Sequence, residues 1–417
     1  MKQEVMNHLK RVKEASYSIS TLTESQRNQI LNELANQLSH AIPELIKENK
    51  NDLAAMDKAD PKYDRLLLSE QRIQSIISDI RLVASLNHPP KRIIEEKYLP
   101  NGLKIKKISV PLGVVAVIYE SRPNVTMDVF CLCFKSGNAC VLKGGKEAYH
   151  SNLFLVSIIS KVLNQHHINP YSLYSLPPER EAMDIVLEAI DYIDVCIPRG
   201  GQTLINYVRE HARIPIIETG SGIVHTYFDA SGTLEKGSLI INNAKTRRVS
   251  VCNALDTLVI HKERLKDLPS LVELLAAQSV MLFADDLSFK ALEKTYPEHL
   301  LHQAAPCHYG QEYLDYKMSI KTVASVEEAV NHISQYTSGH SEAILAEDPS
   351  AIKYFSDHID AAVIYINAST AFTDGGQFGM GAEIGISTQK LHARGPMALD
   401  ALTSYKWVVQ GDGQIRT

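Results

Sequence analysis

From Val114 onwards, short apolar segments alternate with longer stretches that suit helices or loops. Apolar runs of strand length, without polar alternation, are typical of strands buried on both faces of a parallel sheet. Repeated strand–helix order therefore predicts an α/β fold. The predicted strands are Val114–Tyr119, Ala139–Lys143, Ile193–Ile197, Ile214–Ile217, Thr226–Phe228, Thr257–Ile260, Val280–Phe283, Lys317–Val323, Glu342–Leu345 and Ala361–Ile366.

The first ~90 residues are predicted to be helical. Thr23 and Gln26 have the spacing of a helix capping box. Apolar residues then recur at helical spacing, at Ile73, Ile76, Ile77 and Ile80. The segment Leu103–Val110 alternates apolar residues with lysines, as edge or hairpin strands do.

Length and charge narrow the class of protein. A chain of 417 residues can form two or three domains. Its net charge of -5 gives no electrostatic reason to expect a nucleic-acid partner. Residues 1–20 lack the apolar core of a secretory signal, and no apolar stretch approaches the roughly 18 residues that span a bilayer. We therefore expect a cytoplasmic protein with no membrane partner.

The cysteines indicate a reduced protein. Six cysteines are few for this length, which argues against a disulfide framework. Cys131, Cys133 and Cys140 lie in apolar runs rather than in the polar knuckles of zinc sites. Core packing explains these three better than metal binding does, and no metal site is predicted.

Cys252 is the candidate nucleophile. Lys245, Arg247 and Arg248 precede it and Asn253 follows it. Nearby positive charge favours the thiolate, which is the form that attacks carbon. The neighbouring apolar residues are equally compatible with a core cysteine, so this segment alone leaves both interpretations open.

Two loops resemble each other in layout. A strand ends at Lys143 and is followed by Gly144 and Gly145, and another ends near Arg199 before Gly200 and Gly201. A cation and a flexible loop at the carboxyl end of a strand can meet a ribose or a phosphate. Each loop could instead be a solvated turn, but two of them on neighbouring strands favour a dinucleotide groove. The chain has no Walker A motif, and residues 379–385 contain one residue too many for a Rossmann fingerprint.

A third polar turn follows the strand Val114–Tyr119. Within it, Asn124 could donate to a developing oxyanion and Arg122 could neutralise a phosphate. The alternative is an ordinary turn in which Asn124 forms an Asx cap and Pro123 fixes φ.

Taken together, these segments resemble the γ-glutamyl phosphate reductase family of the aldehyde dehydrogenase superfamily. The resemblance is strong from about Val110 to the end of the chain and looser in the N-terminal helices. The segments that carry it are Val110–Val114, Glu120–Thr126, Lys143–Ala148, Ile197–Gly201, Val251–Ala254, Asn367–Thr370, Phe372–Gly376 and Gly381–Pro396.

The resemblance implies an aldehyde dehydrogenase-like α/β fold with two Rossmann-like domains and a small β oligomerisation element. A cofactor-binding domain would comprise residues 1–102, 111–230 and 366–398, and a catalytic domain residues 231–365. Residues 103–110 and 399–417 would form the oligomerisation element.

The implied activity is NADPH-dependent reduction of L-glutamyl 5-phosphate to L-glutamate 5-semialdehyde and phosphate through a cysteine thioester, the second step of proline biosynthesis. The alternative is an NAD(P)-dependent dehydrogenase that oxidises a semialdehyde to an acid. The expected partners are a small-molecule substrate, further copies of the chain and, functionally, glutamate 5-kinase.

The resemblance also assigns residues. Cys252 and Asn124 would be catalytic. The cofactor would contact Lys143, Gly144, Gly145, Arg199, Gly200, Gly201 and Glu312. The substrate would contact Arg122, Arg247, Ser387 and Thr388. His392 and Arg394 could also touch the substrate, although interface or core roles suit them as well.

The chain departs from the family pattern in two places. Val224 stands where the family often has a cysteine, and Asp256 stands where it often has a glutamate four residues after the nucleophile. Oxidising relatives also use a glutamate near Glu218 to activate water, a step that a reductase must avoid. We therefore expect Glu218 to be turned away from the thioester, to serve the substrate amine, or to be structural.

Overall fold

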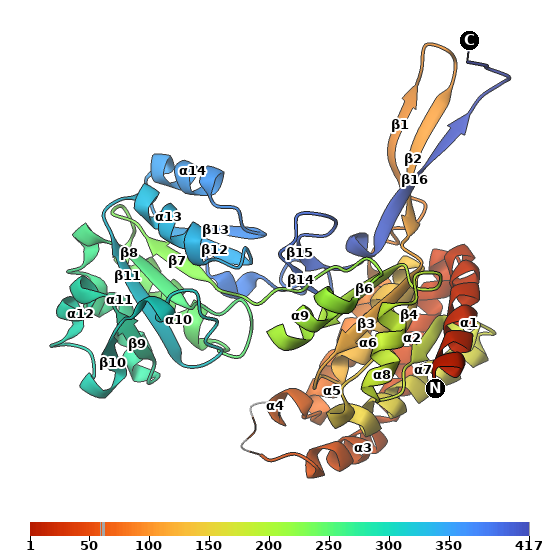
Figure 1. The fold of residues 1–417 in the computed structure, drawn as a ribbon, viewed down its shortest axis with the longest axis horizontal. Coiled ribbons are helices and arrows are strands. Elements are labelled where there is room, and N and C mark those ends of the chain that lie inside the picture. Colours follow the sequence, from red (N-terminus) through yellow and green to blue (C-terminus); the bar gives the residue numbers. More distant parts are fainter. Residues whose placement is uncertain (59, 61–62, 417) are drawn as a thin grey trace. The chain divides into compact units, whose positions relative to one another are not determined.

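A computed structural model describes residues 1–58, 60 and 63–416. The chain forms two compact units. Unit 1 comprises Met1–Thr219, Gly379–Gly385 and Pro396–Thr417, and unit 2 comprises Gly220–Phe378 and Ile386–Gly395. Both units are α/β structures (Figure 1), as predicted.

Unit 1 begins with the predicted helices. The capping box at Thr23 is present, because the Thr23 hydroxyl accepts from the Gln26 amide at 3.3 Å and the Gln26 side chain accepts from the Thr23 amide at 2.9 Å. The helices of this unit are α1 (Lys2–Thr21), α2 (Glu24–His40), α3 (Ile42–Ala54), α4 (Tyr63–Leu66), α5 (Glu70–Ser85), α6 (Asn124–Ser136), α7 (Tyr149–Gln165), α8 (Arg180–Leu187) and α9 (Gln202–His211).

The sheet of unit 1 is parallel, with the strand order β5-β4-β3-β6. Its strands are β3 (Val114–Tyr119), β4 (Ala139–Lys143), β5 (Leu173–Ser175) and β6 (Val195–Arg199). All residues of β3 and β4 are buried, which explains their continuous apolar sequence.

The predicted strand Ile214–Ile217 is wrong. This segment makes a single β-bridge, between Ile216 and Cys196. Pro215 has no amide proton to donate, so it cannot continue a ladder.

A three-stranded antiparallel sheet, here called the arm, extends from the helices of unit 1 (Figure 1). It consists of β1 (Ile93–Tyr98), β2 (Lys104–Pro111) and β16 (Thr403–Gln410), in the order β1-β2-β16. The lysine-rich strand predicted at Leu103–Val110 is therefore confirmed.

Unit 2 is built on a seven-stranded parallel sheet with the order β10-β9-β11-β8-β7-β12-β13. The strands are β7 (His225–Phe228), β8 (Thr257–His261), β9 (Met281–Ala284), β10 (Leu301–Gln303), β11 (Lys317–Val323), β12 (Ser341–Leu345) and β13 (Val363–Ile366). Its helices are α10 (Leu234–Thr246), α11 (Leu268–Ala277), α12 (Asp286–Leu292), α13 (Val326–Tyr336) and α14 (Pro349–His358). Two further short strands, β14 (Gly385–Ser387) and β15 (Gly395–Met397), form a separate sheet.

Apolar clusters fill the core of unit 2. One contains Leu258 and Ile260 of β8 with Leu271 and Leu275 of α11. Another contains Val259 of β8 with residues of α13 and α14. Because neighbouring residues of one strand enter different clusters, β8 is held from both faces, and the loop just before it is anchored on a rigid strand.

Within residues 1–58, 60 and 63–416, no helix is long and apolar enough to cross a membrane. Among the same residues, no three His, Cys, Asp or Glu side chains are grouped as metal ligands. Cys131, Cys133 and Cys140 are buried, as predicted for core cysteines, whereas Cys252 is partly exposed.

Candidate active site

The loop from residue 247 to residue 256 carries Cys252 between α10 and β8. Its backbone is pinned, because Ala254 donates to the Val251 carbonyl at 3.1 Å and Leu255 donates to the Ala244 carbonyl at 3.0 Å. The thiol therefore lies on a fixed loop at the amino-terminal end of a buried strand, and it is partly exposed.

The side chain of Asn253 anchors the same loop. Its amide donates to the carbonyls of Ala371, at 3.3 Å, and Thr373, at 3.0 Å. The Thr370 hydroxyl returns a hydrogen bond to the Asn253 carbonyl at 2.8 Å. The residue after the candidate nucleophile thus has a structural role.

Gly222 packs directly against the backbone of Cys252. A Cβ atom at position 222 would overlap the Cys252 carbonyl group. The Gly222 amide donates to a carboxylate oxygen of Glu312 at 2.9 Å. Glu312 therefore lies in the same neighbourhood as the nucleophile loop.

Asp256 and Lys245 are buried behind Cys252. The Asp256 carboxylate accepts from the amides of Tyr313, at 3.0 Å, and Val224, at 3.3 Å. Burial raises the pKa of Asp256, and the positive charge of Lys245 opposes this shift. Burial likewise lowers the pKa of Lys245, and the charge of Asp256 opposes that shift.

The three cations that precede Cys252 have different environments. Lys245 is fully buried, whereas Arg247 and Arg248 are exposed. A buried ammonium cannot bind a substrate phosphate directly. Of these three, Arg247 and Arg248 can therefore meet a ligand, and Lys245 acts inside the protein.

In unit 1, a strained turn leads from β3 to α6. Ser121 has a left-handed backbone with φ 45°, which is unusual outside glycine. The carboxylate of Glu147 accepts from the Ser121 amide at 2.8 Å. This contact places Asn124 at the first residue of α6.

Asn124 is oriented by Asp128, one helical turn further along α6. The Asn124 amide donates to an Asp128 carboxylate oxygen at 2.9 Å. Burial raises the pKa of Asp128 to about 7, and the Arg199 charge and the Asn124 hydrogen bond oppose this shift. An amide fixed through one N–H leaves its second N–H for another acceptor.

The loop after β6 is already engaged within the protein. Arg199 donates to the backbone carbonyl of Glu383 at 3.3 Å. The Gly201 amide donates to the Glu120 carboxylate at 3.1 Å, and a Cβ atom on Gly200 would come within 2.8 Å of the same carboxylate. The predicted contacts of this loop with cofactor phosphates therefore stay a prediction.

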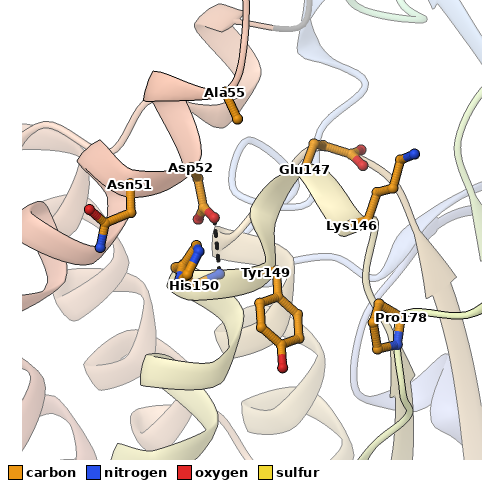
Figure 2. Close-up of a pocket in the computed structure, with 8 residues that line it drawn as sticks. All are labelled: Asn51, Asp52, Ala55, Lys146, Glu147, Tyr149, His150 and Pro178. Atoms are coloured by element: carbon orange, nitrogen blue, oxygen red, sulfur yellow. Dashed lines mark hydrogen bonds between the residues drawn. The ribbon is translucent and has the colours of Figure 1, made fainter.

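Lys143, at the end of β4, contacts Pro178, which is one of the residues that line a pocket of about 250 Å³. Its ammonium donates to the carbonyls of Gly144, at 3.2 Å, and Pro178, at 3.0 Å, and burial lowers its pKa. Figure 2 shows the pocket, whose lining residues are Asn51, Asp52, Ala55, Lys146, Glu147, Tyr149, His150 and Pro178.

The start of α7, at one wall of this pocket, is capped by Asp52 (Figure 2). The Asp52 carboxylate accepts from the amides of His150, at 2.9 Å, and Ser151, at 2.8 Å. These amides are therefore occupied, and an anionic ligand would rely on side chains such as Lys146 instead.

Glu218 forms an ion pair with Arg209 of α9. The Arg209 Nε donates to a Glu218 carboxylate oxygen at 2.8 Å, and a second guanidinium nitrogen contacts the other oxygen. This hydrogen bonding raises the pKa of Arg209. The ion pair with Arg209 agrees with a structural role for Glu218, which is one of the three roles that we expected.

The C-terminal loop residues lie in different settings. Ser387 is fully buried and its hydroxyl accepts from the Gln389 amide at 3.2 Å, whereas Thr388 is partly exposed. A Cβ atom on Gly220 would come within 2.8 Å of the Thr388 hydroxyl. Arg394 pairs with Asp360 at 2.8 Å.

Similarity to solved structures defines the class of protein to which the fold belongs. No protein-family model matches the chain. A glyceraldehyde-3-phosphate dehydrogenase from Methanocaldococcus jannaschii, complexed with NADP, superposes with a TM-score of 0.72 at 15% identity, covering 99% of this chain and 95% of that one. An acetylating aldehyde dehydrogenase from Geobacillus thermoglucosidasius gives a TM-score of 0.71 at 17% identity, covering 100% and 98%. The fold is therefore that of the aldehyde dehydrogenases, as the resemblance implied.

Closer relatives define the family. The γ-glutamyl phosphate reductase of Legionella pneumophila (strain Paris) is 58% identical over 416 residues, with 100% of each chain covered. The crystal structure of the Thermotoga maritima γ-glutamyl phosphate reductase is 38% identical, with a TM-score of 0.94, and covers 99% of this chain and 100% of that one. The chain belongs to the γ-glutamyl phosphate reductase family.

Several residues that shape this site were not predicted from the sequence. Asp128 carries a detectable signal, because its spacing of four from Asn124 places the two on one helix face. The partners of Asp256 and Glu218 carry no such signal, since they come from segments whose proximity depends on the fold.

Proposed function

We propose that this chain reduces L-glutamyl 5-phosphate to L-glutamate 5-semialdehyde and phosphate, the second step of proline biosynthesis. The observation that carries the proposal is a partly exposed Cys252, held on a pinned loop, in a member of the γ-glutamyl phosphate reductase family. Exposure is what a nucleophile requires, and a core cysteine lacks it.

In the proposed reaction, the Cys252 thiolate attacks the acyl carbon of the substrate. The carbon–sulfur bond forms as the bond to the phosphate oxygen breaks, and phosphate leaves. The Asn124 amide and the Cys252 backbone N–H would hold the oxyanion in each tetrahedral state. NADPH, when bound, supplies a hydride to the thioester carbon. Collapse of the resulting tetrahedral anion then breaks the carbon–sulfur bond and releases the aldehyde and the Cys252 thiolate.

The exposed arginines suit the anionic end of the substrate. Arg247 lies five residues before Cys252 and is exposed, so we assign the phosphate to it, with Arg122 as a second cation. Thr388 and Ser387 are proposed donors to the α-carboxylate. Thr388 is the better placed of the two, because Ser387 is buried.

We propose that NADPH binds next to Lys143, at the pocket that Lys146 and Pro178 line. Two of the three Lys143 N–H donors serve backbone carbonyls, which fixes the ammonium beside the pocket, where it could meet a ribose hydroxyl. Lys146 lines the pocket and supplies a positive charge for a 2′-phosphate, which is the group that separates NADPH from NADH. Glu312 and the loops at Gly144–Gly145 and Arg199–Gly201 complete the proposed cofactor contacts.

The test of this function is phosphate-dependent oxidation of glutamate 5-semialdehyde, run in the reverse direction with NADP. We expect turnover in the wild-type protein, and cofactor binding without turnover in Cys252→Ala. Substantial turnover by Cys252→Ala would overturn the nucleophile assignment. Oxidation that needs no phosphate would favour the hydrolytic semialdehyde dehydrogenase instead.

We also propose that the chain forms a homo-oligomer through the arm and acts in the cytoplasm, in functional association with glutamate 5-kinase. The exposed apolar side chains of β16 support the proposed homo-oligomer. None of the six cysteines, all of which the structure describes, forms a disulfide, and this suits a reducing compartment. The assignment of residues 1–102, 111–230 and 366–398 to the cofactor and of residues 231–365 to catalysis is part of the same proposal.

A further inference from the structure

One carboxylate joins the chain segments around the nucleophile loop. Asp256 lies four residues after Cys252, at the entrance to β8. Its two carboxylate oxygens accept from the amides of Tyr313 and Val224, at 3.0 and 3.3 Å. Its backbone amide also donates to the Val224 carbonyl at 2.9 Å. Asp256 therefore ties the segments before β7 and β11 to the segment that carries the thiol.

The segments that Asp256 holds are the ones that contact the Cys252 backbone. Gly222, two residues before Val224, packs on the Cys252 carbonyl. Glu312, next to Tyr313, accepts from the Gly222 amide at 2.9 Å. A shift of Val224 or Tyr313 would therefore be passed to the backbone of Cys252 through Gly222.

Lys245 is the buried counter-charge of Asp256. Its side chain is fully buried, and its ammonium makes no hydrogen bond to any residue that the structure describes. The ammonium lies 5.9 Å from the centre of the Tyr313 ring. A buried charge without a compensating charge is costly, so the opposite charges of Lys245 and Asp256 each make the burial of the other tolerable.

We propose that Asp256, with Lys245 as its buried counter-charge, is a positioning residue that holds the Cys252 backbone in place for attack on the substrate. The inference rests on the proposed role of Cys252 as nucleophile. Neither residue needs to touch the substrate, because their effect passes through the Val224, Gly222 and Tyr313 backbones. Glu312 and Asp315 are two further charged residues near this pair.

The first test replaces Asp256 by asparagine. In the wild-type protein, each oxygen of the Asp256 carboxylate accepts from one backbone amide. The asparagine side chain has only one such oxygen, and its NH2 group would face the other backbone amide. One of the two hydrogen bonds is therefore lost. We expect kcat in the phosphate-dependent oxidation to fall roughly 100-fold, while KM for the semialdehyde changes by less than about twofold. Asp256→Glu keeps the carboxylate and should recover most of the rate.

The second test asks whether Lys245 acts through Asp256. Lys245→Met should lower kcat to a similar extent, and the double variant with Asp256→Asn should be no worse than either single variant, because the two act as a unit. Asp315→Asn is the matched control, since it removes another carboxylate near Lys245 without touching the Val224 or Tyr313 amides. It should keep wild-type kcat.

The outcomes separate the two proposals. The positioning role would be overturned if Asp256→Asn kept the wild-type kcat, or if a rise in KM accounted for its whole loss of activity. It would also be overturned if Asp256→Glu did not restore the rate. Turnover by Cys252→Ala, measured in parallel, would instead overturn the proposed nucleophile. If Asp256→Asn does not fold, Lys245→Met decides the question by the same split between kcat and KM, and Asp256→Glu remains the variant that should keep most of the rate.

Discussion

At the scale of single residues, Lys146 makes the cofactor proposal testable. It lines the pocket beside Lys143, where the amides at the start of α7 are already taken by Asp52. A charged contact worth about 1.4 kcal/mol corresponds to about tenfold in affinity. We therefore expect Lys146→Ala to raise KM for NADP about tenfold and to leave KM for NAD unchanged, as measured by initial rates with each cofactor.

Lys161→Ala is the matched control for this substitution. Lys161 lies in the C-terminal half of α7 and donates to Gln37 at 3.2 Å, and it is not one of the residues that line the pocket. Replacement of Lys161 by alanine should change neither KM for NADP nor KM for NAD. Equal losses with NADP and NAD in Lys146→Ala would contradict a 2′-phosphate contact.

Asp128 gives stability a pH dependence. Its pKa is raised from an ordinary value near 4 to about 7 by burial, so the folded state holds a proton that the unfolded state releases between these pH values. The contribution of Asp128 to stability is therefore greatest below about pH 4, falls as the pH rises towards 7, and is level above 7. Asp128→Asn has no carboxyl group to ionise.

We therefore expect the stability of Asp128→Asn relative to wild type to increase between pH 4 and 7 and then to stay constant. Thermal unfolding of both proteins across this range measures the difference, which cancels the titration of all other groups. A difference in Tm that does not vary with pH would show that Asp128 has no raised pKa.

At the scale of elements, burial decides what the sequence can predict. β3, β4 and β11 have the predicted bounds. For β3 and β4 the reason is burial, because buried parallel strands have nearly continuous apolar sequences. β1 was not predicted, since it is exposed along its whole length and its sequence alternates little. The failure at Ile214–Ile217 came from counting apolar residues without weighing the missing donor of Pro215.

The candidate site divides in a similar way. Cys252 was predicted from the three cations that precede it. Asn124 and Lys143 were predicted because one follows and the other ends a predicted strand, where polar residues are informative. Burial of Lys245 could not be predicted, since its sequence neighbours Arg247 and Arg248 are exposed. Lys245 lies in the last turn of α10, whereas Arg247 and Arg248 follow the helix, and which of these side chains turns inward is a property of packing.

Gly222 brings the segment before β7 into direct contact with the nucleophile loop, so a substitution at position 222 should affect the position of Cys252. A methyl group at position 222 would overlap the Cys252 carbonyl, so one of the two backbones must move. Displacement of a reacting group by about 1 Å can cost roughly 100-fold in rate. We expect Gly222→Ala to lose activity on that order in the phosphate-dependent assay.

Gly237→Ala is the control for the accompanying loss of stability. A Cβ atom there would come within 2.6 Å of the Phe228 ring, in the core of unit 2 and away from Cys252. Both variants should unfold at lower temperature, but Gly237→Ala should keep its activity per folded molecule. Equal activity in the two variants would refute a direct effect of Gly222 on Cys252.

At the scale of the whole molecule, the arm is the part whose apolar side chains stay uncovered in a single copy of the chain. All residues of β1 are exposed, and Tyr405, Trp407 and Val409 of β16 are each about half exposed on one face of the sheet. A three-stranded sheet needs one covered apolar face to be stable. Exposed apolar side chains on such a sheet are typical of a subunit interface.

We therefore expect the wild-type protein to be a homo-oligomer, and the double variant Trp407→Asp with Val409→Asp to be monomeric in sedimentation velocity experiments, because each aspartate would bury an unpaired charge at the interface. Lys406→Asp, on the opposite face of the same strand, is the control and should leave the assembly intact. The wild-type melting temperature should also rise with protein concentration, since association stabilises the folded state by mass action, and that of the double variant should not. A wild-type protein that sediments as a monomer at every concentration would show that the arm is covered in some other way.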